Sequence, residues 1–504
     1  MSNTISKKTW WLIGLICATK LAIHLWANGN YGFHRDELLH IACGDHLAWG
    51  YMEFPPFIGW MAALQRTLLG DSVLAIRLLP ALLGTTIVLF SALAAKALGG
   101  NGRAMIVAAL VTFGAHAYWR NHTLFQPVVF DQFFWTLGFL LLIWYLNTQQ
   151  RHYLLALGVV AGLGLLNKYT MLFWGAGLGI GILLSPQRWL LQKRDLWLAL
   201  GIALLLFAPN IWWQAQHDFP FLEHASGLYD RHFDSSRWTI VNDQFWDMNP
   251  FALPFWLGGA LFLLGSPKMA NYRVLGITFF ATFTLFLITN AKSYYLFALY
   301  PIFFAAGGVA FAKIVPPKWQ WVIAIYLFCL LGRALVALPH VTPLLPIQSF
   351  AQYAGLDYDQ TGRLQGLTGD YADMFGWEEQ VQLVDSLYQS LSPEEQEQCV
   401  LWAENYGEAG AIQHLGRAYK LPPPLCKHGS FWLWEDQHSK AEIAISIGNE
   451  PDAVGYFFQD TTLVRMIQHP YAIDEEHNIP VYLCRSPKVY LKDYWPNYRP
   501  YIFD

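Results

Sequence analysis

Charge is what this sequence has least of. Asp, Glu, Lys and Arg make up only 13% of its 504 residues, where soluble domains carry about 25%. The net charge of −4 comes without a basic stripe, which argues against nucleic acid as a partner. The chain is instead rich in apolar residues. Residues 1–338 are apolar runs with short polar breaks, whereas residues 339–504 have the composition of a soluble domain.

Cysteine is scarce as well, and its spacing argues against two common uses. None of the 6 cysteines forms a C-x-x-C pair, as a zinc ribbon or a thioredoxin-like site would require. Three of them, Cys399, Cys426 and Cys484, fall in the soluble region. In an oxidising compartment one pair could be bridged there, and we expect Cys399–Cys426. Three buried free thiols are the alternative.

The apolar runs have the length of membrane-spanning helices, which need about 20 apolar residues each. Residues 54–70 form a further, amphipathic segment that we expect on the membrane surface. The sequence predicts eleven spans, over residues 10–28, 72–96, 103–119, 127–146, 153–167, 169–185, 196–214, 250–266, 273–290, 294–312 and 319–338.

Basic residues predict how these spans are oriented. Lys7 and Lys8 precede the first span and are expected in the cytoplasm. With alternating sides, every even-numbered loop is then short, basic and cytoplasmic, and the loop 29–71 and the soluble region lie on the other face. The first run is too long for a signal-peptide core and lacks an A-x-A site, so we expect an uncleaved anchor.

The soluble region mixes strand and helix patterns. Apolar runs of strand type lie at 398–403, 441–447 and 480–484, and helices are expected over 377–391 and 393–398. This mixture predicts a small α/β domain over residues 339–504, after a polytopic α-helical membrane domain over residues 1–338.

The loop 31–57 carries the most polar cluster between apolar segments. The adjacent carboxylates Asp36 and Glu37 point to different sides of a helix, so one can face a substrate while the other takes a structural partner. If Arg35 or another basic residue keeps it ionised, Asp36 can act as the general base for a hydroxyl. His34, Arg35 and His40 are candidates for sugar or acceptor contacts. The alternative is an ordinary acidic start of a helix.

A metal site in this loop is a second alternative. Glu37 and His40 form one E-x-x-H step, but a di-iron bundle needs a second such motif on another helix. Asp474 and His477 have the same spacing, but they lie in a polar segment of the soluble region. We therefore expect neither a bound metal nor another cofactor.

Single charged residues mark the apolar runs themselves. Asp131 lies inside an apolar run, where an ionisable residue is a functional candidate, unless water wets it at the membrane interface. Lys168 and Lys292 break the rule that basic residues stay cytoplasmic, and a phosphate on the other face would explain them. Lys292, which Tyr294 and Tyr295 follow closely, is the stronger candidate. Ordinary snorkelling is the alternative.

The segment 210–224 mixes aromatic and polar side chains. Gln214 and His217 lie among several aromatic residues there. Such a mixture is suited to a sugar, which aromatic rings stack on and amides bind. It is equally typical of an aromatic belt at a membrane interface.

Taken together, these features form a familiar pattern. The motifs that carry it are Asp36-Glu37, Gly50 to Pro55-Pro56, Asp131, Asn167–Tyr169, Pro209–Gln214, Lys292–Pro301, Gly376–Glu379 and Asn405–Gly410. Their order resembles bacterial C-type glycosyltransferases of the family 39/83 type, which include protein O-mannosyltransferases and the transferase that adds aminoarabinose to lipid A. The resemblance covers nearly the whole chain.

The resemblance implies a reaction and a role for each matching residue. A sugar on a polyprenyl-phosphate lipid would be attacked at its anomeric carbon, with inversion, on the periplasmic face of the inner membrane. Asp36 would be the base, Glu37 its neighbour and Asp131 a second acidic residue. Lys292 would meet the lipid phosphate, with Lys168 and Tyr295 as further candidates. No catalytic metal is implied.

One departure leaves the acceptor open. Members that modify lipid A often carry Asp-Glu-x-Arg, whereas Leu38, Leu39 and His40 follow Asp-Glu here. The acceptor is therefore a lipid, a glycan or a protein in the periplasm.

Two other functions remain as alternatives. A flippase for a lipid-linked sugar should show inverted repeats and breaks in the middle of the membrane, and neither is seen in the sequence. A non-enzymatic membrane anchor for a periplasmic binding domain would tolerate substitution of Asp36, Asp131 and Lys292.

Overall fold

The structure, a computed structural model, describes residues 5–232, 236–434 and 441–498. The chain divides into two compact units, which are described separately below. The helical unit comprises Met1–Asn28, Phe54–Phe57 and Leu74–Leu344, and the mixed unit comprises Gly29–Glu53, Ile58–Val73 and Leu345–Asp504.

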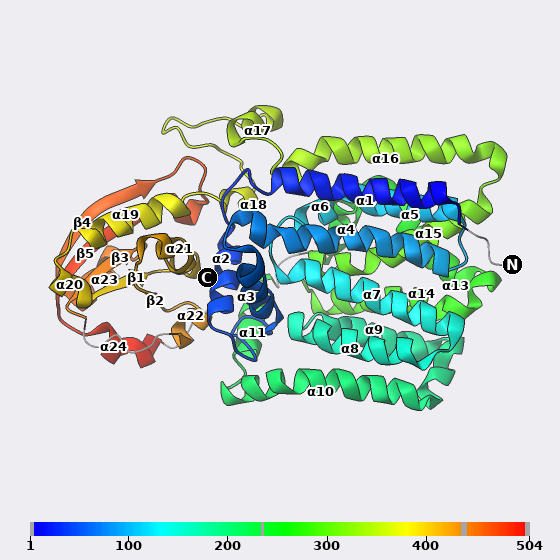
Figure 1. Cartoon of the computed structure of the whole chain (residues 1–504), viewed down its shortest axis with the longest axis horizontal. Helices are drawn as coiled ribbons and strands as arrows, with labels where there is room; N and C mark the ends of the chain where they lie inside the picture. Colours follow the sequence, from blue (N-terminus) through cyan, green and yellow to red (C-terminus); the bar gives the residue numbers. More distant parts are fainter. Residues whose placement is uncertain (1–4, 233–235, 435–440, 499–504) are drawn as a thin grey trace. The chain divides into compact units, whose positions relative to one another are not determined.

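The helical unit is built from long helices that run side by side (Figure 1). Its α-helices are α1 (Lys7–Ala27), α4 (Val73–Ala97), α5 (Gly102–Gly114), α6 (His116–Asn121), α7 (Pro127–Thr148), α8 (Arg151–Asn167), α9 (Met171–Leu184), α10 (Arg194–Gln216), α11 (Pro220–His232), α12 (Arg237–Asp247), α13 (Leu253–Gly265), α14 (Arg273–Thr289), α15 (Tyr300–Ile314) and α16 (Gln320–Val341). Short 3-10 turns join several of them, namely η1 (Pro186–Gln192), η2 (Pro250–Ala252), η3 (Pro267–Tyr272), η4 (Ser293–Leu299) and η5 (Pro317–Trp319).

Each predicted apolar run contains a helix, but the count of eleven spans is not confirmed. Among the described residues, 7 helices are long and apolar enough to cross a membrane. The number is up to 8 if the pair Arg237–Asp247 and Pro250–Gly265, bent by 87°, is one span. Three predicted runs contain the shorter apolar helices α5, α8 and α9, of 13, 17 and 14 residues. These fall short of the roughly 20 residues that a bilayer core requires.

Glycines let neighbouring helices of this unit approach closely. A Cβ added at Gly158 of α8 would collide with the backbone of Ala199 of α10, and one added at Gly177 of α9 would collide with Thr282 of α14. The glycine-rich pieces around residues 157–164 and 175–181 therefore serve helix packing.

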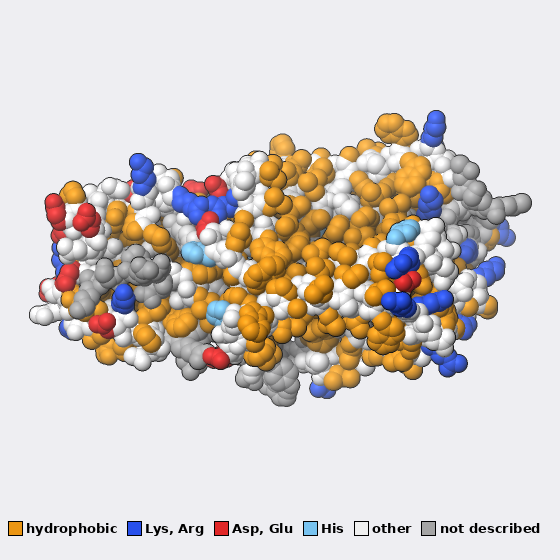
Figure 2. Space-filling view, turned by 60° about the horizontal axis from the view of Figure 1, so that its bottom comes forward, with side chains coloured by type: hydrophobic (Ala, Val, Ile, Leu, Met, Phe, Trp, Pro, Cys, Tyr) orange, Lys and Arg blue, Asp and Glu red, His pale blue; other side chains and the backbone are white. Residues whose placement is uncertain are grey.

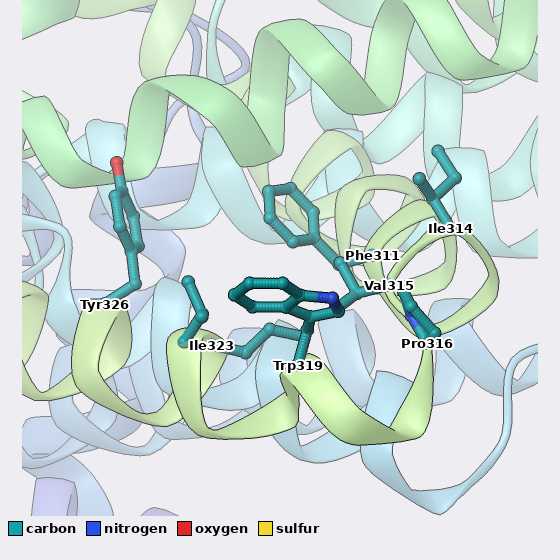
Figure 3. A pocket seen from close by; sticks show the side chains of 8 residues that line it. Phe311, Ile314, Val315, Pro316, Trp319, Ile323 and Tyr326 are labelled. Carbon is teal, nitrogen blue, oxygen red and sulfur yellow. The ribbon is translucent and has the colours of Figure 1, made fainter.

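The surface of the helical unit separates apolar from charged side chains. Figure 2 shows a broad band of hydrophobic side chains along this unit, with Lys and Arg gathered at one end. A second feature of this surface is an apolar pocket of about 310 Å³ between α15 and α16 (Figure 3). Phe311, Trp319 and Ile323 are among the residues that line it. Its lining carries no charged side chain, so it is no candidate for chemistry.

The mixed unit combines a sheet with short helices. Its α-helices are α2 (Arg35–Asp45), α3 (Phe57–Leu69), α17 (Ile347–Ala354), α18 (Gly369–Ala372), α19 (Trp377–Gln389), α20 (Pro393–Glu397), α21 (Tyr406–Leu415), α22 (Ser430–Leu433), α23 (Pro451–Phe457) and α24 (Leu491–Tyr494). Its 3-10 turns are η6 (Gly416–Tyr419), η7 (Asp474–Glu476) and η8 (Trp495–Tyr498), and its strands are β1 (Cys399–Ala403), β2 (Pro424–Cys426), β3 (Ile443–Ile447), β4 (Phe458–Gln468) and β5 (Asn478–Pro487).

The five strands form one sheet in the order β2-β1-β3-β5-β4. β1 pairs in parallel with β2 and β3, while β5 is antiparallel to β3 and β4. The expected strands at 398–403, 441–447 and 480–484 correspond to β1, β3 and β5, and the two expected helices to α19 and α20. β1 and β3 are buried along their whole length, which is why their apolar runs were easy to recognise.

Two strands were missed for opposite reasons. β2 has only 3 residues, too few to show a period. β4 has 11 residues, but nearly all of them are exposed, so its sequence lacks the alternation of a half-buried strand. The core that the sheet builds on one side includes Trp402 and Phe457, whose rings meet edge to face at 5.4 Å.

The expected disulfide Cys399–Cys426 is absent, and all three cysteines of this region are free thiols. The strand register explains it. Cys426 of β2 lies opposite Ala403, four residues along β1 from Cys399, or about 13 Å away. A disulfide needs Cα atoms within about 7 Å.

Candidate functional site

The start of α2 gives the two adjacent carboxylates different tasks. His34 is the N-cap of this helix: its Nδ1 accepts the N–H of Asp36 at 3.1 Å. Glu37 closes the capping box, because its Oε2 accepts the N–H of His34 at 2.9 Å. Glu37 is fully buried and binds the backbone at the start of its helix. The side chain of Asp36 is directed toward Tyr406 instead.

Asp36 is a half-buried, ionised carboxylate. The hydroxyl of Tyr406, the first residue of α21, donates to its Oδ1 at 3.1 Å. Burial alone would raise the pKa of Asp36, but electrostatic interaction with His34, His40 and Arg35 and the hydrogen bond from Tyr406 outweigh it and hold this pKa below its usual value. The carboxylate is therefore charged at neutral pH.

Arg35 and His34 are engaged by acidic residues of the mixed unit. The guanidinium of Arg35 places Nε 3.3 Å from Asp373 and Nη1 2.6 Å from Glu475. The Nε2 atom of His34 lies 3.6 Å from the second oxygen of Asp373. The structure thus gives these two predicted sugar or acceptor contacts a role in holding the start of α2. His40, one turn after Asp36, is buried, and its electrostatic interaction with Asp36 lowers the pKa of that carboxyl.

Two glycines explain why α2 lies directly against α21. A Cβ at Gly410 would come within 2.8 Å of Leu38 Cβ and 3.0 Å of its carbonyl carbon, and one at Gly407 within 2.7 Å of Arg35. Side chains at these positions would push the helices apart. The motif Asn405–Gly410 therefore builds the surface on which Asp36 is carried.

The rest of the loop is tied to the same unit. Asp45, at the end of α2, pairs with Arg66 at 2.5 Å, and also with Arg417. Glu53 is buried and accepts hydrogen bonds from the N–H and the hydroxyl of Ser430, at 2.7 and 2.5 Å. Burial raises the pKa of Glu53 in spite of these bonds.

A second polar cluster lies in the helical unit, at the turn between α8 and α9. The residues of this turn contact three other elements, α7, α10 and η4. Asn167 donates to the carbonyl of Pro127 at 3.0 Å, and Tyr169 donates to the side chain of Asn210 at 2.9 Å. Thr170 donates to Oδ2 of Asp131 at 2.7 Å. Lys168 lies with Nζ 4.0 Å from the ring centre of Tyr295 and 5.1 Å from that of Tyr294.

Asp131 and Lys168 are thus brought into one cluster. Asp131 is 3% exposed, and its Oδ1 has no hydrogen-bond partner among the described residues. The charge of Lys168 acts on this carboxylate. A buried carboxylate is costly unless it is paired. The charge of Lys168 therefore stabilises the buried Asp131, in addition to any role in binding a ligand.

Three further predicted residues, Lys292, Gln214 and His217, belong to the helical unit. Lys292 is half-buried and precedes η4, the turn that carries Tyr295. Gln214 is buried near the end of α10, and its Oε1 accepts the N–H of Phe221 at 3.3 Å. His217 stacks on Trp213 with ring centres 4.0 Å apart, within the same helix end. For His217, the described contacts are local.

Three contributors were missed by the sequence. Tyr406, Asp373 and Thr170 have no local signature, because each acts on a residue far away in the chain. Only Tyr406 lies in a motif that the resemblance had singled out. Among the described residues, no group of three or more His, Cys, Asp or Glu side chains is placed to hold a metal ion.

Comparisons with known proteins agree with the resemblance. Residues 53–213 match the family described as Dolichyl-phosphate-mannose-protein mannosyltransferase. The lipid A galacturonosyltransferase RgtD of Rhizobium johnstonii is 30% identical over 200 residues, which cover 39% of this chain and 41% of that protein. The chain therefore matches less than half the length of this curated relative.

The fold has solved counterparts. The crystal structure of ArnT from Cupriavidus metallidurans bound to undecaprenyl phosphate superimposes with a TM-score of 0.66 at 16% identity, over 94% of this chain and 98% of that one. The structure of the same protein in the apo state gives 0.63 over the same shares, also at 16% identity. At this identity the likeness establishes the fold. With the family match, it confirms the resemblance to glycosyltransferases of the family 39/83 type.

Proposed function

We propose that this chain is a multi-pass glycosyltransferase of the bacterial inner membrane. It transfers a monosaccharide from a polyprenyl-phosphate donor to a lipid, glycan or protein acceptor in the periplasm. The observation that carries the proposal is the Asp36 carboxylate, which is accessible in part, surrounded by basic side chains and bonded to Tyr406. The glycosyltransferase relatives support the same class of reaction.

In the proposed step, the acceptor hydroxyl attacks the anomeric carbon from the side opposite the phosphate. The new carbon–oxygen bond forms as the bond to the phosphate oxygen breaks, so the configuration inverts. The hydroxyl proton passes to Asp36, and the electron pair of the broken bond leaves on polyprenyl phosphate. Because the pKa of Asp36 is held low, the carboxylate is ready to accept that proton without first losing one.

The second cluster supplies the charge that a phosphate needs. Lys168, against Tyr295 in the helical unit, and Lys292 at the same turn offer compact positive charges for the phosphate of the donor. Asp131 holds the turn between α8 and α9 through Thr170 and balances the charge of Lys168 when the donor is absent. Glu37 keeps Asp36 at the first turn of its helix.

Orientation follows from the basic end of the helical unit. The Lys and Arg side chains that gather there (Figure 2) support a cytoplasmic location for that end. In this arrangement the chain crosses the membrane eleven times, the three short apolar helices included, and residues 339–504 form a periplasmic α/β domain.

The test is transfer by Asp36→Asn in membranes supplied with a radiolabelled polyprenyl-phosphate monosaccharide. Asparagine keeps the shape but cannot accept the proton, so transfer should fall by about 100-fold or more, with donor binding retained. Asp452→Asn is the matched control, because Asp452 is exposed in the first turn of α23. Wild-type transfer by Asp36→Asn would contradict the proposal.

A further inference from the structure

We propose that Tyr406 is a positioning residue for the Asp36 carboxylate, so that the sheet-bearing part of the mixed unit takes part in the reaction. This inference rests on the proposed role of Asp36. It adds that a residue 370 positions further along the chain controls the direction in which the base faces.

The hydrogen bond from Tyr406 restricts the rotation of the Asp36 carboxylate, which is otherwise free. The side chain of aspartate turns easily about its last bond, because that torsion has broad minima. A hydroxyl that donates to Oδ1 of Asp36 at 3.1 Å selects one setting and thereby gives Oδ2 one direction. Burial and the neighbouring charge of Asp36 raise the pKa of Tyr406, so its phenol stays protonated and remains a donor.

Tyr406 itself is held tightly. It directly follows Asn405, the N-cap of α21, whose Oδ1 accepts the N–H groups of Gly407 and Glu408 at 2.8 and 3.1 Å. The amide of Asn405 donates in turn to Glu476 at 2.8 Å. β1 ends three residues before Tyr406, and the carboxyl ends of parallel strands are where α/β folds place their functional groups.

The Asp36 side of the contact is equally constrained. The guanidinium of Arg35 lies 5.5 Å from the ring centre of Tyr406 while it pairs with Asp373 and Glu475. Gly407 and Gly410 bring α2 against α21. The Tyr406 hydroxyl comes from a helix start that a capping box fixes, and the Asp36 carboxylate follows a residue that ion pairs hold. This is the preorganisation that a general base requires.

A purely structural hydrogen bond would have a different signature. It would change the stability of the mixed unit but not the turnover of each folded molecule. The chain offers a matched control at the other end of the same helix. There the hydroxyl of Tyr51 donates to the carbonyl of Cys43 at 2.7 Å, and no contact described for it involves Asp36.

The experiment compares Tyr406→Phe with Tyr51→Phe in the full-length protein. Both variants keep the ring and remove one hydroxyl from an attachment of α2. With the radiolabelled polyprenyl-phosphate monosaccharide as the varied substrate, Tyr406→Phe should lower kcat per folded molecule by about 10-fold, as expected for a hydrogen bond to a charged group. Its KM for the donor should not change. Tyr51→Phe should keep the wild-type kcat.

A double variant tests whether the effect passes through Asp36. On the residual transfer of Asp36→Asn, adding Tyr406→Phe should have no further effect, because residues that act as a unit are not additive. A further 10-fold loss in that background would overturn the inference. So would a Tyr406→Phe variant whose kcat per folded molecule equals that of Tyr51→Phe, even if less of it folds.

The two proposals fail in distinguishable ways. If Asp36→Asn transfers sugar like the wild type, the proposed function fails at its base. If Asp36→Asn is inactive while Tyr406→Phe keeps the wild-type kcat, the base stands and only the positioning role is lost.

Discussion

The ammonium group of Lys168 lies 4.0 Å from the centre of the Tyr295 ring. The two residues come from different parts of the helical unit, the turn after α8 and the turn η4. The cation–π contact holds the ammonium group in place, and the Asp131 carboxylate of the same cluster interacts with its charge. The arrangement keeps a positive charge at a defined position, which is what recognition of a phosphate needs.

Lys168→Met should raise the KM for the polyprenyl-phosphate donor by about 10- to 100-fold, because a charge-assisted contact to phosphate is lost. Lys168→Arg should recover part of the affinity. Titration of the donor in membranes measures both. Lys313→Met is the control, since Lys313 also lies over a ring, that of Phe262, but near the last turn of α15. An unchanged KM in Lys168→Met, with a raised KM in Lys292→Met, would assign the phosphate to Lys292 instead.

Gly410→Ala should separate α2 from α21. The added Cβ would lie 2.8 Å from Leu38 Cβ and 3.0 Å from its carbonyl carbon, so the backbone of α2 must move. We expect a loss of about 1–3 kcal/mol in stability and a clear loss of transfer, as Asp36 is carried away from Tyr406. The measurements are the thermal midpoint of the solubilised protein and its transfer rate.

Gly455→Ala is the control for that experiment, because Gly455 lies within α23 with open space at its Cβ. Alanine is the better helix former, so stability should be equal or slightly higher there. Equal stability and transfer in both variants would show that the close approach of α2 to α21 is not required.

Glu408→Gln should flatten the dependence of stability on pH. Burial and the nearby Glu476 raise the pKa of Glu408 well above its usual value. The folded state therefore favours the protonated form. Its contribution is fully present below the ordinary pKa of about 4.3 and is lost as pH rises through the raised value. Wild type should thus lose stability from about pH 4.5 upward, and Glu408→Gln should lose less.

Thermal midpoints of the solubilised protein between about pH 4.5 and 8 test this expectation. Glu378→Gln is the control, because Glu378 is exposed in the first turn of α19 and should leave the slope unchanged. A Glu408→Gln slope equal to that of the wild type would show that this carboxyl does not titrate with folding.

Much of the fold could be predicted because its signals are local. Each apolar run from 10–28 to 319–338 holds a helix, since a span must be predominantly apolar and must satisfy its backbone hydrogen bonds within the segment. The strands β1 and β3 were recognised for the same reason. The short β2 and the exposed β4 were not, because neither carries a period that the chain could show by itself.

Only the charged residues of the candidate site could be predicted from the sequence. Asp36, Asp131 and Lys168 are noticeable in the sequence, because a charge among apolar residues is costly and is kept for a reason. The residues that donate hydrogen bonds to these carboxylates do not stand out in the sequence. Thr170 and Tyr406 are ordinary polar residues, and nothing near them in the chain shows that each donates to a carboxylate 39 or 370 positions away.

The sequence by itself thus determined where the long apolar helices lie, which charged residues stand out and which class of glycosyltransferase the chain resembles. Local periodicity and the cost of burying charge are properties of short segments, so they can be read without a structure. Tertiary structure alone decided that Asp36 meets Tyr406, that Arg35 is held by Asp373 and Glu475, and that Cys399 and Cys426 stay apart. Those outcomes depend on which distant segments pack together, and the register of strands and the contacts of glycines set that packing.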